Sequence, residues 1–134
     1  MKKRVFRNKI VYWISIIYFL TISIALIINL IDITNFFNNK ISYFFNLLVT
    51  IFTITIFVNL IEKFSKTTLL ISIFLSVIIL YNLFSVFDEI SLTEIKSIIF
   101  HIIFLILVNF FKVNQKDILK SEEIDQIGNE NFEF

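Results

Sequence analysis

Three long runs of apolar residues without a charged side chain constrain this fold more than any other feature of the sequence. They cover residues 10–31, 41–61 and 67–87. A helix needs about 20 apolar residues to cross a bilayer. The runs are continuous, unlike the alternating pattern of membrane β-strands, and the first is longer than the apolar region of a cleaved signal peptide. They therefore predict three transmembrane helices, the first of them retained.

A fourth transmembrane helix is predicted from a weaker signal. Its uncharged run covers only residues 97–111, but Ser91-Leu92-Thr93-Glu94 precedes it. Ser91 and Glu94 have the spacing of a capping box, in which both side chains bond to free backbone N–H groups at a helix start. Lys96 can extend its alkyl stem along the helix and keep its ammonium at the headgroups. We therefore expect a fourth span over about 93–111, continuing past Phe111.

The composition also favours lipid as the main solvent. Hydrophobic residues make up 57% of the chain and charged residues 17%, against about 45–50% and about 25% in typical soluble proteins. The chain has no Cys, which excludes disulfides, thiol redox chemistry and cysteine-ligated metals. The formal net charge of +1 indicates no nucleic-acid partner, so the bilayer itself is the first expected partner.

The basic residues predict how the chain is oriented. Short cytoplasmic segments of membrane proteins are enriched in Lys and Arg. Ten of the twelve basic residues lie in residues 1–9, in the connection around 63–66, or in residues 112–120, and the other two are Lys40 and Lys96. In a chain that crosses the membrane four times, the three basic segments share one side. We therefore expect a multi-pass protein of the cytoplasmic (inner) membrane, with both termini in the cytoplasm.

These features predict an all-α fold, an up-down-up-down bundle of four transmembrane helices. Residues 1–9 form a basic cytoplasmic flank, residues 10–111 the transmembrane domain, and residues 112–134 a short helical tail, basic and then acidic. The tail is interpreted either as a solvated helix end or as a docking peptide that uses Phe132 and Phe134.

Polar side chains within the spans are the candidate functional residues. The spans have no Asp, Glu, Lys or Arg away from their ends, and such residues are what ion-coupled transporters, proton pumps and voltage sensors use. We expect the polar residues to form contacts between helices in the bundle; the alternative is a polar cavity for a ligand or proton. The candidates are Asn29, Asn46, Asn59, Asn82, His101 and Asn109.

His101 is the only histidine and the one side chain within the spans that titrates near neutral pH in its free form. One His without Cys or an intramembrane carboxylate supplies too few ligands for a metal. Glu94 and Ser97 lie on the same predicted helix face, but Glu94 is two turns away. The sequence contains no motif for a nucleotide or other cofactor. No catalytic, cofactor-binding or metal-binding residue is predicted.

Three functions remain open from the sequence. The first is a non-enzymatic accessory protein that binds another membrane protein, or itself, within the cytoplasmic membrane. The second is a small pore-forming, permeability or immunity-type protein that acts as an oligomer. The third is a membrane-embedded enzyme or proton-linked carrier that uses His101. The absence of a catalytic constellation favours the first.

Overall fold

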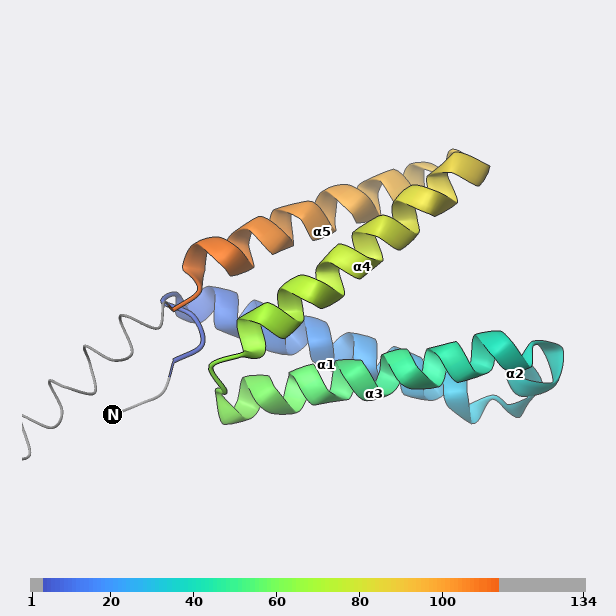
Figure 1. Cartoon of the computed structure of the whole chain (residues 1–134), viewed down its shortest axis with the longest axis horizontal. Coiled ribbons are helices and arrows are strands. Elements are labelled where there is room, and N and C mark those ends of the chain that lie inside the picture. Colours follow the sequence, from blue (N-terminus) through green and yellow to red (C-terminus); the bar gives the residue numbers. More distant parts are fainter. Residues whose placement is uncertain (1–3, 114–134) are drawn as a thin grey trace, which may run out of the picture.

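The computed structural model describes residues 4–113, which fold into five helices and contain no strand. The long helices are α1 (Lys9–Ile31), α3 (Lys40–Glu62), α4 (Thr67–Asp88) and α5 (Leu92–Phe111), and α2 (Ile33–Asn38) is a short helix between α1 and α3. Each long helix has 20–23 residues and is apolar enough to cross a membrane. The prediction of an all-helical chain with four candidate membrane spans is confirmed at this level (Figure 1).

Polar side chains start the first three helices. The Asn8 side chain accepts a hydrogen bond from the Ile10 N–H at 2.8 Å, the start of α1. Asp32 accepts from the Thr34 N–H at 3.1 Å and caps α2, and Asn39 caps α3 in the same way. These oxygens satisfy N–H groups that have no partner within the helix. The segment between the first two long helices therefore contains one short helix.

The turn between α3 and α4 is closed around the carbonyl oxygen of Asn59. Lys63 has a left-handed backbone (φ 57°), and its N–H donates to this oxygen. The Phe64 N–H donates to the same oxygen at 3.1 Å, and the Thr67 hydroxyl donates at 3.2 Å. In this common type of helix C-terminus, a residue with left-handed backbone lets the following N–H groups bond to the last free carbonyl oxygens of the helix. As a result, α4 starts only a few residues after α3 ends.

The predicted capping box at the start of α5 does not form. Ser91 is the N-cap residue, but its side chain makes no cap hydrogen bond. Oε1 of Glu94 instead accepts a 2.6 Å hydrogen bond from the Ser85 hydroxyl on α4. A partner on the adjacent helix thus replaces the backbone partner, and Glu94 joins α5 to α4.

The helix α5 ends at Phe111, so the expected continuation past this residue is wrong. Lys112 has an extended backbone (φ −58°, ψ 145°). The Arg7 N–H donates to the Phe111 carbonyl at 2.8 Å, and the Val113 N–H donates to the Val5 carbonyl at 3.2 Å. These bonds take the place of further helical bonds. Apart from its first two residues, the tail predicted over 112–134 lies outside the described residues.

The long helices pack as two hairpins, α1 with α3 and α4 with α5. The hairpins meet at the end that holds the α3–α4 turn and part toward the other end (Figure 1). Two tyrosine hydroxyls on the first hairpin donate to carbonyl oxygens of its other helix, from Tyr12 to Leu60 at 3.2 Å and from Tyr43 to Leu30 at 2.9 Å. The expected bundle is therefore open on the side between α3 and α4.

Aromatic rings fill the region where the hairpins meet. Phe74 on α4 is 4% exposed. Its ring centroid lies 5.4 Å from that of Phe19 on α1 and 6.1 Å from that of Phe52 on α3. Phe19 is fully buried. Phe74 is thus the side chain through which α4 contacts both helices of the first hairpin.

We expect the Phe74→Ala substitution to destabilise the fold by about 2 kcal/mol. This loss of stability is smaller than the loss of about 3–5 kcal/mol that is typical of Phe→Ala in soluble cores, because acyl chains can fill part of the cavity. The control is Phe84→Ala on the same helix, where the ring is 71% exposed. Unfolding by dodecyl sulfate in mixed micelles, followed by fluorescence of the single Trp13, measures both. Equal losses in the two variants would contradict the role of Phe74.

Candidate functional site

A chain of polar side chains connects α1, α4 and α5. Nε2 of His101 on α5 lies 2.7 Å from the Tyr18 hydroxyl on α1. Nδ1 of His101 lies 2.6 Å from the Ser97 carbonyl oxygen. The Asn82 amide on α4 donates to the Ser97 hydroxyl at 3.1 Å. His101 and Asn82 therefore take part in one network that connects both hairpins.

The bonds of His101 determine its neutral tautomer. A carbonyl oxygen can only accept, so Nδ1 carries the hydrogen and donates to Ser97. In the neutral ring Nε2 then accepts, and the Tyr18 hydroxyl donates to it. Phe100 and Phe104 flank the pair, and the Phe104 ring centroid is 4.9 Å from that of Tyr18. The imidazole is thus held at both nitrogens among apolar rings.

Two further polar pairs connect α4 to α5 on either side of His101. Toward the α4–α5 loop, Glu94 accepts from Ser85, and its Oε2 is buried without a hydrogen-bond partner in the part of the chain described. Toward the opposite end, the Asn109 amide donates to the Ser72 hydroxyl at 3.2 Å and to the Leu105 carbonyl at 2.9 Å. Side-chain hydrogen bonds therefore join α4 and α5 along most of their length.

The other three predicted asparagines have different environments. Asn29 is exposed, and its backbone carbonyl, not its side chain, accepts from Asn35. Asn59 acts through its backbone carbonyl in the turn after α3. The half-buried Asn46 lines a groove between α3 and α4. Within residues 4–113, the side chains of Asn29, Asn46 and Asn59 make no hydrogen bond to another helix.

The network provides little for chemistry beyond hydrogen bonding. Residues 4–113 contain no group of three or more His, Asp or Glu side chains placed to hold a metal ion. The hydrogen-bond partners of His101 are a phenol and a serine, and the carboxylate of Glu94 bonds to Ser85. A histidine held by donors and acceptors from two helices is typical of a structural contact in a membrane bundle.

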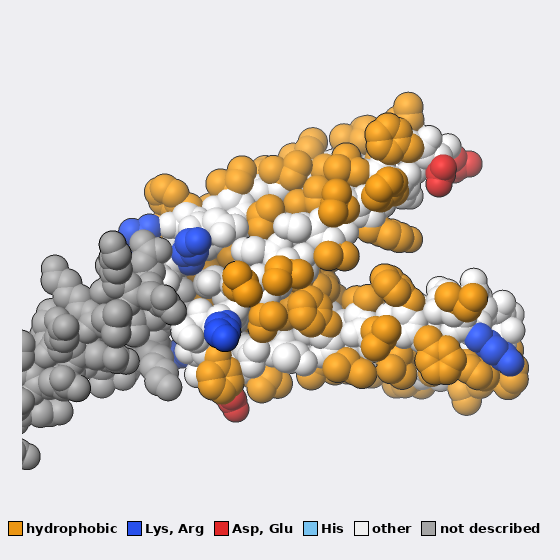
Figure 2. Space-filling model, in the orientation of Figure 1, with side chains coloured by type: hydrophobic (Ala, Val, Ile, Leu, Met, Phe, Trp, Pro, Cys, Tyr) orange, Lys and Arg blue, Asp and Glu red, His pale blue; other side chains and the backbone are white. Residues whose placement is uncertain are grey.

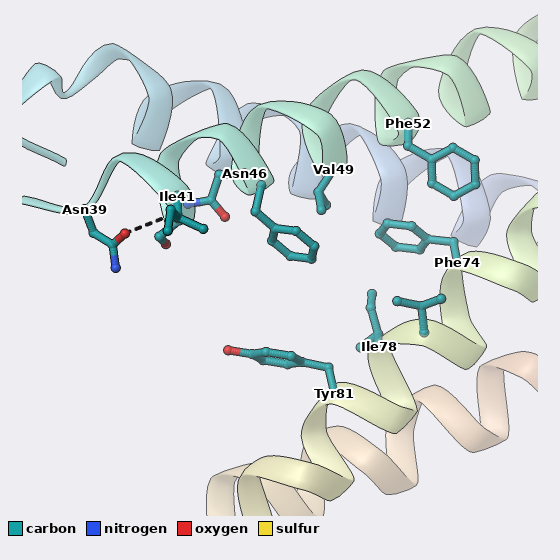
Figure 3. A pocket seen from close by; sticks show the side chains of 11 residues that line it. Asn39, Ile41, Asn46, Val49, Phe52, Phe74, Ile78 and Tyr81 are labelled. Carbon is teal, nitrogen blue, oxygen red and sulfur yellow. Dashed lines mark hydrogen bonds between the residues drawn. The ribbon is translucent and has the colours of Figure 1, made fainter. Parts of the chain in front are cut away.

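A groove between α3 and α4 is a structural feature that the sequence did not reveal. It has a volume of about 710 Å³, within the about 300–1,000 Å³ range typical of ligand sites. Figure 3 shows it between the two hairpins, with Phe52 and Phe74 at one end and Asn39 at the other. The residues that line it are Asn39, Ile41, Ser42, Phe45, Asn46, Val49, Phe52, Phe74, Val77, Ile78 and Tyr81.

The molecular surface separates apolar sides from charged ends. Apolar side chains cover the long helices in Figure 2, whereas basic side chains gather at the end with the α3–α4 turn. That end holds Arg4, Arg7, Lys9, Lys63, Lys66 and Lys112, together with Glu62. The opposite end holds Lys40 and Lys96 with Asp32, Asp88, Glu89 and Glu94. This distribution matches a helical protein that is surrounded by lipid along its length.

No protein-family model, curated protein or solved structure matches this chain. The polar network and the groove are therefore the observations on which a function is proposed. The sequence indicates one half of this network, because Tyr18 lies on the same face of the first predicted span as Ser15 and Asn29. Its partner on α5 depends on how the hairpins meet.

We expect Tyr18 and His101 to be energetically coupled by about 0.6–1.7 kcal/mol, between the average and the maximum for hydrogen bonds between membrane helices. A double-mutant cycle with Tyr18→Phe and His101→Leu measures this coupling from unfolding in mixed micelles. Tyr43→Phe is the matched control, since its hydroxyl bonds to Leu30 on the other side of the fold. A coupling between Tyr43 and His101 as large as that of Tyr18 would argue against a direct bond.

Proposed function

We propose that this chain is a non-catalytic, multi-pass protein of the cytoplasmic membrane that acts by binding another membrane component between its two hairpins. Both termini lie in the cytoplasm in this proposal. The observation that carries it is the groove between α3 and α4. It opens between two apolar helices and exposes aromatic and aliphatic side chains to whatever surrounds the protein.

The distribution of charge supports the orientation. Six basic residues within 4–113 lie at the end where the described N- and C-terminal segments pair, and two lie at the other end. Lys and Arg are enriched on the cytoplasmic side of membrane proteins. The backbone bonds between the two terminal segments place residues 5–7 and 111–113 together. Both segments therefore belong on the same side of the membrane.

We expect a cysteine at Ser65 to react with a membrane-impermeant maleimide only from the cytoplasmic side, and one at Asn38 only from the opposite side. Both residues are exposed and lie at opposite ends of α3. The chain has no Cys, so each label is unique and the unmodified protein is the blank. Labelling of intact cells and of inverted vesicles measures the two accessibilities. Reaction at both positions from one side would refute the four crossings.

The contacts within the first hairpin give no support to a pore lined by its serine and threonine hydroxyls. Ser15, Thr50 and Thr53 are buried. Each of their hydroxyls donates to the carbonyl oxygen four residues earlier in its own helix, at 2.6–2.8 Å. The hydrogen of each of these hydroxyls is therefore already donated to the backbone. The groove, which faces outward, favours binding over conduction.

A photoreactive diazirine amino acid at Val77 tests whether the groove is occupied selectively. We expect ultraviolet light to produce one dominant adduct, because a bound component stays in the groove longer than bulk lipid stays at an open surface. The matched control is Ile103 on α5, equally exposed at 54% and outside the groove. Gel mobility and intact mass identify the adducts. Identical adducts at both positions, in bulk-membrane proportions, would reject binding in the groove.

A further inference from the structure

The groove is about as deep as one leaflet of a bilayer. It extends along α3 from Asn39, the N-cap residue, to Phe52. At 1.5 Å per residue these positions are about 20 Å apart along the axis. Half of a bilayer, with its headgroup region, is also about 20 Å thick. Since α3 begins at Lys40, the groove extends from one membrane surface to the midplane.

The inner end of the groove is closed by aromatic side chains. The rings of Phe52 and Phe74 lie 6.1 Å apart where the two hairpins meet. Beyond them, α3 and α4 are joined by the tight turn around Asn59. A partner helix that crosses the membrane needs about 30 Å of hydrocarbon thickness, so it would leave the groove halfway. An acyl chain ends at the midplane and fits the closed end.

The groove also changes from apolar to polar along its length. Val49, Val77 and Ile78 line the inner part, next to the two phenylalanines. Asn39 and Ser42 lie at the outer end with Ile41, near the start of α3, so hydrogen-bonding side chains are added there to the apolar lining. This is the polarity of a lipid, whose hydrocarbon lies at the midplane and whose polar groups lie at the surface.

Hydrogen-bond donors are free in the middle of the groove and at its outer end. The Tyr81 hydroxyl points toward the outer end in Figure 3 and makes no hydrogen bond within residues 4–113. The side-chain amide of Asn46 also has no partner among the described residues. The Asn39 side chain accepts from the Ser42 backbone through Oδ1, which leaves its NH₂ group to donate. Phosphate and ester oxygens of a phospholipid accept such bonds.

We propose that this groove holds one glycerophospholipid from the leaflet opposite the termini. Its acyl chains extend to Phe52 and Phe74, and its ester and phosphate oxygens accept hydrogen bonds from Asn39, Asn46 and Tyr81. The proposal rests on the membrane-embedded binding function proposed above and names the class of component bound. Lys40, next to Asn39 in sequence and at the same end of α3, adds a positive charge near the phosphate.

Phospholipid retained during purification tests the proposal. The full chain is extracted in mild detergent, washed extensively with the same detergent, and analysed by mass spectrometry for phospholipid per chain. We expect about one retained phospholipid, and a loss of about tenfold in Val77→Trp, which corresponds to about 1.4 kcal/mol of binding. Ile103→Trp, equally exposed and outside the groove, should retain the lipid. Equal retention in the two tryptophan variants would overturn the proposal.

A second variant covers the case in which Val77→Trp fails to fold. The double substitution Asn46→Leu with Tyr81→Phe removes two donors at little change in volume. Lower retention of phospholipid in this double variant supports the proposal, whereas unchanged retention contradicts it.

The diazirine at Val77 separates this proposal from the broader one. A dominant protein adduct there would overturn lipid binding and leave the proposed binding function intact. Adducts at Val77 that match those at Ile103 in both identity and yield would reject both.

Discussion

The ring of Phe74 lies between Phe19 and Phe52, and this contact sets the depth at which the two hairpins part. Lipid tails are as apolar as leucine, so the hydrophobic effect does not drive helices together in a bilayer and close packing must do so. The aromatic cluster supplies that packing where α1, α3 and α4 meet. Beyond it α3 and α4 diverge, and the groove exists because no comparable ring joins them there.

Hydrogen bonds complement this packing in a different part of the molecule. The pairs Asn82–Ser97, Ser85–Glu94 and Ser72–Asn109 join α4 to α5 along most of their length. The bond from Tyr18 to His101 then attaches α1 to the same hairpin. In contrast, no hydrogen bond between α3 and α4 is present along the described groove. The second hairpin is thus a hydrogen-bonded unit, and its contacts with the first hairpin include the Phe74 ring, the His101 imidazole and the Thr67 hydroxyl.

The sequence predicted the long helices well because length and apolarity suffice to locate a span. The predicted bounds of about 10–31, 41–61, 67–87 and 93–111 differ by one residue at most from the helices. Their pairing was not predictable, because a polar face indicates that a helix has partners but not which helix supplies them. Asn29 and His101 look alike in this respect, yet only His101 meets another helix through its side chain. The groove could not be predicted from the sequence for the same reason, since its lining residues come from two helices, α3 and α4, whose relative position depends on the pairing.

The pairing of Val5 and Arg7 with Phe111 and Val113 has a consequence for how the chain assembles. Residues 5–7 leave the ribosome long before residues 111–113, so this contact cannot form until all four long helices have been made. Contacts between residues so far apart in sequence carry the largest entropy of loop closure. The first hairpin, by comparison, needs only residues up to Glu62. The segment before α1 therefore becomes bonded only after α5 has been made, when residues 111–113 pair with residues 5–7.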